Sequence, residues 1–218
     1  MASITIYPLD NYKIGKKDGK PSKDMTPPAR LSRMEAKYEN EGLRRTVEGV
    51  LLIHQHEHPH VLLLQFGPSA FRLPGGRLRP GETEEQGLLR KLDNKLAPAV
   101  QDADPPSWEV GQELAQWWRP NFDVHQYPYL PVHISRPKES RKVFLIHLPK
   151  QCTFAISKTY NIVAVPLYDL YANEQRYGPV VAAIPLLLAR FSMSCEVALP
   201  PEIEVEEEEL ERTESKEE

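Results

Sequence analysis

A glycine-rich loop that leads into a charged helix carries the clearest chemical signal in this sequence. Residues 75–98 read GGRLRPGETEEQGLLRKLDNKLAP, where Glu82 follows Gly76 after five residues and Arg90 follows Glu82 after seven. A strand-to-helix loop of this kind, followed by helical carboxylates, suits hydrolysis of phosphoanhydrides, because carboxylate oxygens hold Mg²⁺ beside the substrate phosphates. The helix after Arg90 is basic instead, so the segment predicts binding and not hydrolysis.

The loop and helix resemble the signature of Nudix pyrophosphatases, in which the arginine is followed by Glu-hydrophobic-X-Glu-Glu. This chain continues from Arg90 with KLDNK, so Lys91, Asn94 and Lys95 replace the three helical carboxylates. Two ammonium groups cannot replace two Mg²⁺ ligands. The resemblance implies an α/β fold, a Nudix-type α/β/α sandwich with a mixed sheet. The substitutions predict a protein that is not an enzyme, with no catalytic residue, metal or cofactor.

Local signals specify this helix well. Thr83 with Gln86 three residues later fits a capping box, and Glu84 and Glu85 complement the helix dipole and are poor substitutes for the lost ligands. Apolar residues recur at helical spacing at Leu88, Leu89, Leu92 and Leu96. The replaced positions share another face, which would be ordinary solvated surface if the helix stood alone.

Length and charge fit one globular unit with an acidic tail. The chain has 218 residues, of which 40% are hydrophobic, enough for a sizeable core. Residues 202–218 carry ten Glu against Arg212 and Lys216, a net charge of −8, so residues 1–201 carry +4 within a total of −4. The mildly basic body is compatible with an anionic partner that binds a shaped site. The tail composition predicts disorder, and a sharper alternative is that the tail folds back and competes with phosphate.

Cysteine usage and hydropathy favour a reduced intracellular compartment. Cys152 and Cys195 are the two cysteines, and the first ten residues lack the basic start and apolar run of a secretory leader. No run approaches 18 apolar residues, so we expect no membrane span.

The order of patterns predicts three regions. Residues 1–42 form an N-terminal arm and a short helix, residues 43–195 form the Nudix-fold domain, and residues 196–218 form the acidic tail. Within the first region, the extended ITIYPL and the polar stretch that ends at Pro28 are expected to lie on the surface. A helix over residues 30–42 then ends at Gly42.

Apolar runs predict the strands and helices of the domain. TVEGVLLIH and HVLLLQFG, joined by the polar QHEHP, form a hairpin, and KVFLIHL is a further strand. IVAVPLYDLY runs from strand into helix, VVAAIPLLLARF is a last apolar helix, and WEVGQELAQWW is ambiguous. Four prolines in residues 119–140 predict a rigid extended loop packed by its aromatic residues. Strands with helices on both sides give an α/β sandwich.

Several longer segments resemble one particular group of Nudix-fold proteins. RRTVEGVLL, HVLLLQ, LPGG, WWRPNF, QYPYLPVHI, RPKE and YGPV are similar to the small Nudix-fold subunit of pre-mRNA cleavage factor Im, also called cleavage and polyadenylation specificity factor subunit five. The similarity runs from about Ile4 to Phe191. It implies a nuclear, homodimeric, catalytically inactive protein that recognises UGUA elements upstream of poly(A) sites and carries a larger RRM-containing subunit.

The same resemblance implies a set of RNA-binding residues. Single-stranded RNA is read by stacking on aromatic faces and by hydrogen bonds to base edges. The positions that match the family's RNA contacts are Arg30, Glu48, Phe71, Leu73, Tyr177 and Gly178. Glu48 is unusual without the resemblance too, because a carboxylate in an apolar run needs hydrogen-bond donors, from a base edge or from Arg44, Arg45 or another cation. Without the resemblance, Arg30 would be interpreted as a surface arginine, Phe71 as a core residue, and Tyr177 before Gly178 as packing in a turn.

Departures from the family pattern concern two of its RNA contacts. Where the family has two successive aromatic residues before LPGG, this chain has Ala70 and Phe71, so one stacking platform is missing. An acidic residue in the arm aligns with Ser22. We therefore expect the preference for UGUA to persist, with weaker affinity or relaxed discrimination.

Alternate histidines form one more pattern, at His54, His56, His58 and His60. Such a tract can bind zinc or nickel, but Pro59 and the two flanking strands favour a solvent-facing turn. Two hypotheses about function remain. The first is a sequence-reading RNA-binding subunit, and the alternative is a nucleotide-binding or residual hydrolase domain for dinucleoside polyphosphates, with a ligand-sensing pseudoenzyme between them.

Overall fold

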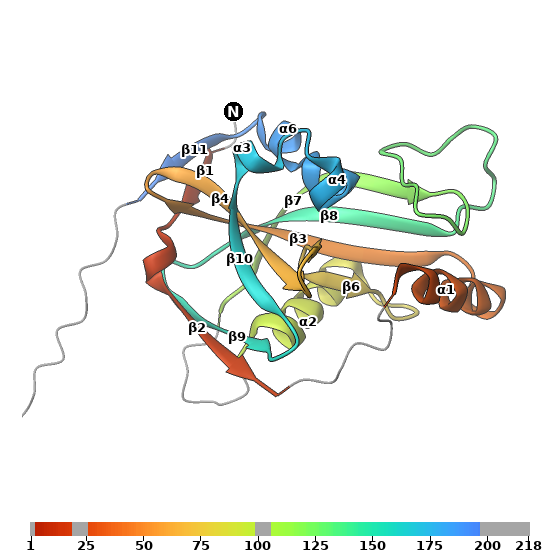
Figure 1. Cartoon of the computed structure of the whole chain (residues 1–218), viewed down its shortest axis with the longest axis horizontal. Coiled ribbons are helices and arrows are strands. Elements are labelled where there is room, and N and C mark those ends of the chain that lie inside the picture. The colour runs from red at the N-terminus through yellow and green to blue at the C-terminus, as the bar shows by residue number, and fades with distance from the viewer. Residues whose placement is uncertain (1–2, 19–25, 99–105, 197–218) are drawn as a thin grey trace, which may run out of the picture.

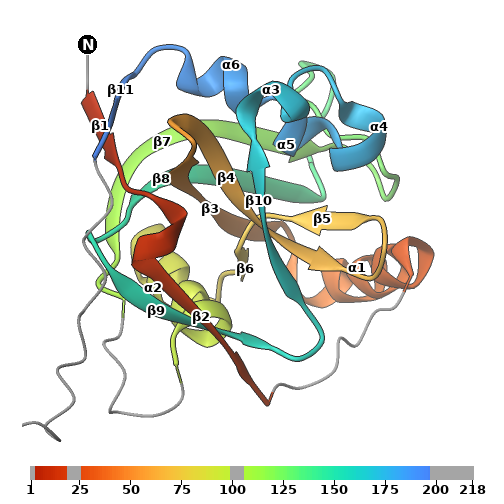
Figure 2. The ribbon, with the colours of Figure 1, turned by 60° about the vertical axis from the view of Figure 1, so that its left-hand side comes forward.

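The computed structural model describes residues 3–18, 26–98 and 106–196. The predicted acidic tail beyond Glu196 and the loosely aligned Ser22 lie outside these residues. Within them the chain forms a mixed sheet with helices on both faces, as Figures 1 and 2 show.

A seven-stranded mixed sheet forms the centre of the molecule. Five strands follow the order β10, β4, β3, β8, β7, while β5 pairs with β4 and β6 pairs with β3. The neighbours β3 and β8 are parallel and the remaining pairs are antiparallel. The strands are β3 (Arg44–Gln55), β4 (His58–Phe66), β5 (Ala70–Arg72), β6 (Gly75–Arg77), β7 (Glu109–Arg119), β8 (Glu139–His147) and β10 (Asn161–Pro166).

The predicted hairpin is confirmed as β3 and β4. His56 and Glu57 connect the strands with positive φ angles of 52° and 62°, as in the tight turns that match strand twist. The ambiguous segment over residues 108–118 is strand β7, and the predicted strand over residues 142–148 is β8.

Helices cover the two faces of the sheet. Helix α2 (Glu84–Leu96) lies on one face, and four short helices lie on the other (Figure 1). Because side chains alternate along a strand, Leu51 and Ile53 of β3 pack toward α2, while Val50 and Leu52 pack toward the short helices. The short helices are α3 (Leu167–Leu170), α4 (Glu174–Tyr177), α5 (Pro179–Ala182) and α6 (Ile184–Leu188). The predicted α/β sandwich is confirmed.

The single apolar helix predicted over residues 180–191 is wrong, because the segment divides into α5 and α6 at Ala183. Pro185 has no N–H to donate to a carbonyl one turn earlier, so a continuous helix would lose a hydrogen bond there. At the first turn of α6 the proline costs little, because N–H groups there have no helical partner.

The predicted surface arm is also wrong for its first strand. Ile4 and Ile6 in β1 (Ser3–Ile6) are 3% and 1% exposed, and β1 pairs in parallel with β11 (Ser192–Cys195). After a 3-10 helix (Leu9–Asn11), β2 (Tyr12–Lys17) pairs with β9 (Cys152–Ser157), and neither strand was predicted. The beginning of the chain is thus part of the packed body, while the domain boundary at residue 42 stays a prediction.

Helix α1 (Pro27–Glu41) begins three residues before its predicted start. The Thr26 side chain accepts a hydrogen bond from the Ala29 N–H at 3.4 Å, and prolines occupy the first helical positions, where they are tolerated. Gly42 ends the helix as predicted, with a φ of 65°.

The proline-rich loop between β7 and β8 is irregular, as predicted, and its aromatic packing is confirmed in part. Phe122 makes an edge contact with Tyr38 of α1, with ring centroids 5.5 Å apart. Tyr127 and Tyr129 contact each other, yet Tyr129 remains 59% exposed.

Candidate nucleic-acid interface

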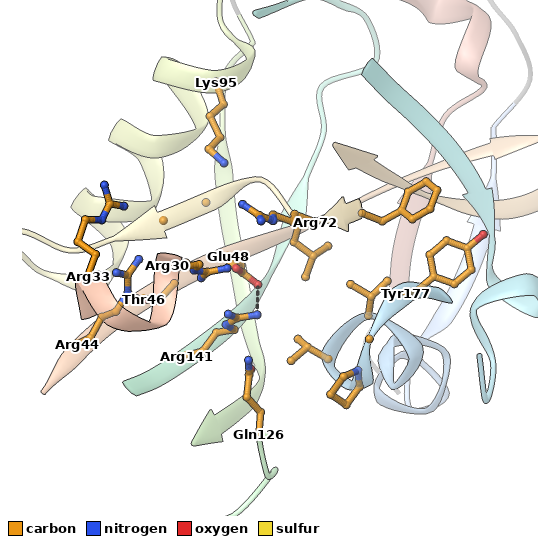
Figure 3. A pocket seen from close by; sticks show the side chains of 18 residues that line it. Arg30, Arg33, Arg44, Thr46, Glu48, Arg72, Lys95, Gln126, Arg141 and Tyr177 are labelled. Atoms are coloured by element: carbon orange, nitrogen blue, oxygen red, sulfur yellow. Dashed lines mark hydrogen bonds and ion pairs between the residues drawn. The ribbon is translucent and has the colours of Figure 1, made fainter. Parts of the chain in front are cut away.

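A cavity of about 360 Å³ opens where α1, β3, β5, β6 and the α4–α5 junction meet (Figure 3). All six residues assigned to RNA binding line it: Arg30, Glu48, Phe71, Leu73, Tyr177 and Gly178. They are spread over nearly 150 positions of the sequence. The fold therefore brings the predicted residues together, although their role in RNA binding stays a prediction.

The retained glycine loop shapes one wall of this cavity. Gly75 in β6 lies opposite Glu48 in β3, with a φ of 151°. A Cβ atom at Gly75 would lie 2.2 Å from the Val47 carbonyl oxygen and 2.6 Å from the Glu48 Cα. Only glycine allows the loop to approach the strand this closely, which keeps Leu73 and Glu48 on the same cavity.

The partner of the Glu48 carboxylate among the described residues is a cation, which is one of the two kinds of partner expected from the sequence. Its Oε2 lies 3.6 Å from Nη1 of Arg141 in β8, and each side chain is 12% exposed. The partner is neither Arg44 nor Arg45. At 3.6 Å the contact is an ion pair longer than a good hydrogen bond, so the carboxylate retains capacity to accept hydrogen bonds from a ligand.

Next to the cavity, the buried Glu139 carboxylate forms ion pairs with Arg44 and Arg119. Glu139 is 1% exposed and accepts hydrogen bonds from Thr46 at 2.9 Å and from Arg119 at 3.1 Å. Arg44 Nε also lies 3.1 Å from its Oε1. Burial opposes ionisation of Glu139, but Arg141, Arg44 and Arg119 hold its pKa down at about 2. This network anchors one wall of the cavity.

Cations dominate the cavity lining. Within the described part of the chain, no hydrogen bond or ion pair holds the side chains of Arg30, Arg72 or Lys95. Burial and then the nearby Arg141 lower the pKa of Arg30 to about 10. Half-buried cations without a carboxylate contact are costly, and an anionic ligand would relieve that cost.

Two buried polar atoms of the cavity residues lack partners among the described residues. They are the acceptor Gln126 Oε1 and the donor Arg141 Nε. Buried polar groups are normally hydrogen-bonded, so each of these two atoms calls for an explanation. A polar ligand that presents both donors and acceptors would satisfy both.

An aromatic pair forms the opposite wall. The rings of Phe71 and Tyr177 lie 4.9 Å apart with an interplanar angle of 55°. Tyr177 is only 5% exposed, and its hydroxyl donates to Asp169 Oδ2 at 2.5 Å. Burial and then this hydrogen bond raise the pKa of Tyr177 to about 12. Leu73, which also lines the cavity, is 2% exposed.

Comparisons with known proteins agree with this architecture. A Nudix family model described as a nucleotide hydrolase matches residues 2–191. The pre-mRNA cleavage factor Im 25 kDa subunit 2 of Arabidopsis thaliana is 50% identical over 188 residues, which cover 86% of this chain and 94% of that protein. The chain belongs to the family of small cleavage factor Im subunits.

Two further similarities are a second relative and a distant solved structure. Cleavage and polyadenylation specificity factor subunit 5 of Dictyostelium discoideum is 45% identical, over 87% of this chain and 94% of that protein. A solved structure of a UDP-X diphosphatase has a TM-score of 0.45 at 13% identity, over 79% of this chain and 76% of that one, a likeness too distant to bear on function.

Of Lys91, Asn94 and Lys95, the residues expected to replace the Nudix carboxylates, Lys95 alone lines the cavity. The Lys91 side chain packs against Gly76, where an added Cβ would lie 3.1 Å from its Cε. Asn94 is exposed and donates to the Arg90 carbonyl at 2.6 Å. The predicted capping box at Thr83 and Gln86 is confirmed.

The four histidines do not share a face. His54 and His60 are buried in β3 and β4, where His54 Nε2 contacts the Glu196 carbonyl at 2.6 Å. His56 lies in the turn and is exposed, as is His58. The expectation of a wholly solvent-facing segment is therefore wrong for two of the four.

Metal-binding clusters and membrane-spanning helices are both absent from the described residues. These residues contain no group of three or more His, Cys, Asp or Glu arranged to hold a metal ion. None of their helices has the length and apolar character that crossing a membrane requires.

Sequence reasoning assigned no place in this site to several polar cavity residues, among them Arg33, Arg72, Lys95, Gln126 and Arg141. Arg72 could have been predicted, because it lies between Phe71 and Leu73, which were both assigned to the site. Arg141 could not, because its place depends on the parallel register that sets it opposite Thr46. Lys95 was interpreted as a lost metal ligand that could still attract phosphate, and the sequence did not indicate that it lies in this cavity.

Proposed function

We propose that this chain is a non-catalytic RNA-binding subunit of cleavage factor Im, which recognises UGUA-type elements in pre-mRNA during 3′-end cleavage and polyadenylation. The observation that carries the proposal is that one cavity combines unpaired cations, an aromatic pair and Glu48. Cations suit phosphates, rings suit bases, and a carboxylate accepts hydrogen bonds from base edges.

The unmatched atoms of Gln126 and Arg141 support recognition of bases in particular. A ligand that carried only phosphate could accept from Arg141 Nε but could not donate to Gln126 Oε1. A nucleobase presents both donors and acceptors along its edges. The cavity thus suits a nucleotide chain better than an inorganic anion.

The ion pairs made by Glu82 and Glu84, the carboxylates that remain in the loop and helix, support the proposal that the chain is not catalytic. Glu82 is clamped by Arg90, and Glu84 contacts Arg45 at 3.2 Å and Lys142 at 2.9 Å. Carboxylates satisfied by cations are poor Mg²⁺ ligands, and the helical positions of the Nudix signature offer no others. Hydrolysis of dinucleoside polyphosphates remains the alternative, and Mg²⁺-dependent release of mononucleotide from diadenosine polyphosphate would establish it.

The family supports three more proposals about the setting of this function. Relatives at 45–50% identity are named as cleavage factor subunits. We propose that this chain acts in the nucleus, forms a homodimer and binds a larger RRM-containing subunit. Light scattering of the purified chain tests the dimer, and co-expression with the larger subunit from the same organism tests the partnership.

Equilibrium binding of two short RNAs tests the main proposal. One RNA contains UGUA and the other the same bases in scrambled order, at one fixed salt concentration, because affinity for phosphates alone varies with salt. The proposal expects tighter binding of the UGUA RNA. Equal dissociation constants would contradict it.

A further inference from the structure

Lys95 lies at the junction of two cavities. It lines the candidate RNA site and also a second cavity of about 190 Å³. The second cavity is lined by residues of β2, β4, β9 and α2 and by Tyr160, which precedes β10. Its lining also includes Asp18, whose carboxylate pairs with Lys158 at 2.8 Å. In Figure 3, Lys95 and Arg72 point into the same part of the first cavity from α2 and β5.

The second cavity offers the side chains that bind a nucleotide without reading its sequence. The Tyr160 ring lies 5.9 Å from Lys95 Nζ and 5.7 Å from the Phe66 ring. The Lys16 ammonium donates to the Tyr160 carbonyl at 2.8 Å, which fixes the backbone beneath the ring. A partly exposed ring beside an ammonium group is the usual equipment for stacking a base next to its phosphate.

The electrostatics around Lys95 call for an anion. Its ammonium group has no hydrogen bond or ion pair with any described residue. Burial lowers the pKa of Lys95 to about 8; Glu48 on β3 opposes this, whereas Arg72 on β5, Lys91 on α2 and Arg30 on α1 add to it. A phosphodiester keeps its negative charge at every relevant pH and would restore the charged form.

The other cation of the second cavity is already engaged. Lys17 Nζ donates to the carbonyls of Ala97 at 2.5 Å and Asp93 at 3.4 Å, so it caps the end of α2. Lys95 is therefore the group at this junction whose charge is available to a ligand.

We propose that the RNA chain leaving the first cavity crosses Lys95 into the second, where a flanking nucleotide sets its phosphate on the Lys95 ammonium and its base on the Tyr160 ring. This inference rests on the proposed function and extends it. The binding footprint is then longer than the four-base element, and the added nucleotide is bound whatever its base, because every base has a face that can stack.

RNAs of graded length test the flanking site. UGUA alone is compared with UGUA carrying two extra nucleotides at its 5′ end or at its 3′ end. We expect extension at one end to tighten binding at least fivefold, with little dependence on the added bases. Tyr160→Leu should abolish this gain and leave the affinity for UGUA alone unchanged. Tyr168→Leu, at an exposed tyrosine of α3, is the matched control that keeps the gain.

Lys95 is tested by charge removal. Lys95→Met should weaken binding of the extended RNA about tenfold, weaken binding of UGUA alone less, and reduce the slope of log affinity against log salt for the extended RNA by about 0.7. Wild-type affinity should also fall between pH 7 and 9, and this fall should disappear in Lys95→Met. Lys91→Met, one turn earlier on the helix and outside both cavities, is the control with a smaller effect.

The outcomes separate this inference from the proposed function. If wild-type protein binds UGUA and scrambled RNA equally, the proposed function fails. If UGUA is preferred but neither extension tightens binding, or if the gain survives Tyr160→Leu, the flanking site alone is overturned. Unchanged affinity and salt slope in Lys95→Met would overturn the phosphate contact.

Discussion

Glu82 and Arg90, the two charged residues kept from the Nudix signature, bind each other through two hydrogen bonds. Arg90 Nε donates to Glu82 Oε1 at 2.6 Å, and Nη2 donates to Oε2 at 2.5 Å. The Arg79 N–H adds a third hydrogen bond, to Oε2, at 2.8 Å. Arg90, followed by this N–H group, lowers the pKa of Glu82 to about 2. The pair closes the loop onto the helix, which is a structural task that needs no metal ion.

Because this clamp occupies Glu82, Mg²⁺ should have no effect on thermal stability. The melting temperature in millimolar Mg²⁺ should equal that in chelator at matched ionic strength. Arg90→Met, which releases Glu82, should melt at a lower temperature and still show no response to Mg²⁺. A clear rise in melting temperature with Mg²⁺ would show that the chain still holds a metal site.

Glu48→Gln should remove most of the discrimination between UGUA and scrambled RNA. An amide in place of the carboxylate weakens the hydrogen bonds accepted from base edges, and one such specific contact is typically worth about 1–3 kcal/mol, or roughly 5- to 150-fold. Glu84→Gln is the matched control, because Glu84 lies outside the cavity. Discrimination that survives in Glu48→Gln would assign base reading to other groups.

Ala70→Phe should tighten RNA binding. Ala70 opens β5 beside Phe71, at the position where the family pattern suggests a second aromatic ring. A stacked base contributes about 1–3 kcal/mol. Ala70→Leu adds apolar bulk without an aromatic face and should give little gain, which isothermal titration of both variants can compare. An equal gain in both variants would point to packing and not to stacking.

Glu139→Gln should destabilise the fold at neutral pH by about 3–5 kcal/mol, because buried arginines lose their counter-charge. The folded pKa of Glu139, about 2, lies below its usual value of 4.5, so its carboxylate stabilises the fold above pH 4.5 and loses this effect as pH falls toward 2. The difference between wild type and variant should therefore be constant near neutral pH and shrink below pH 4.5. Denaturant unfolding at several pH values measures it, with the exposed Glu39→Gln as control.

Features written in adjacent residues were predictable from the sequence. The capping box of α2 needs only Thr83 and Gln86, and the hairpin needs two apolar runs around a short turn. The six candidate contacts were found through family resemblance, since Phe71 and Tyr177 alone look like ordinary packing. Their meeting in one cavity became visible only in the fold.

Features that depend on distant contacts were not predictable. Strand β2 is largely polar in sequence, and it forms because β9 offers its edge 140 residues later. The ion pair of Glu48 with Arg141 follows from the parallel pairing of β3 with β8. The sequence around either residue gives no indication of this contact. The position of Lys95 between two cavities likewise needs α2 packed against the sheet.

The most direct test of the central claim is the ratio of dissociation constants for scrambled and UGUA RNA, measured over a range of salt concentrations. Phosphate contacts weaken with salt for both RNAs alike, whereas base contacts do not. We predict that both affinities fall with added salt while the ratio stays roughly tenfold or more. A ratio near one at every salt concentration would contradict sequence reading by this cavity.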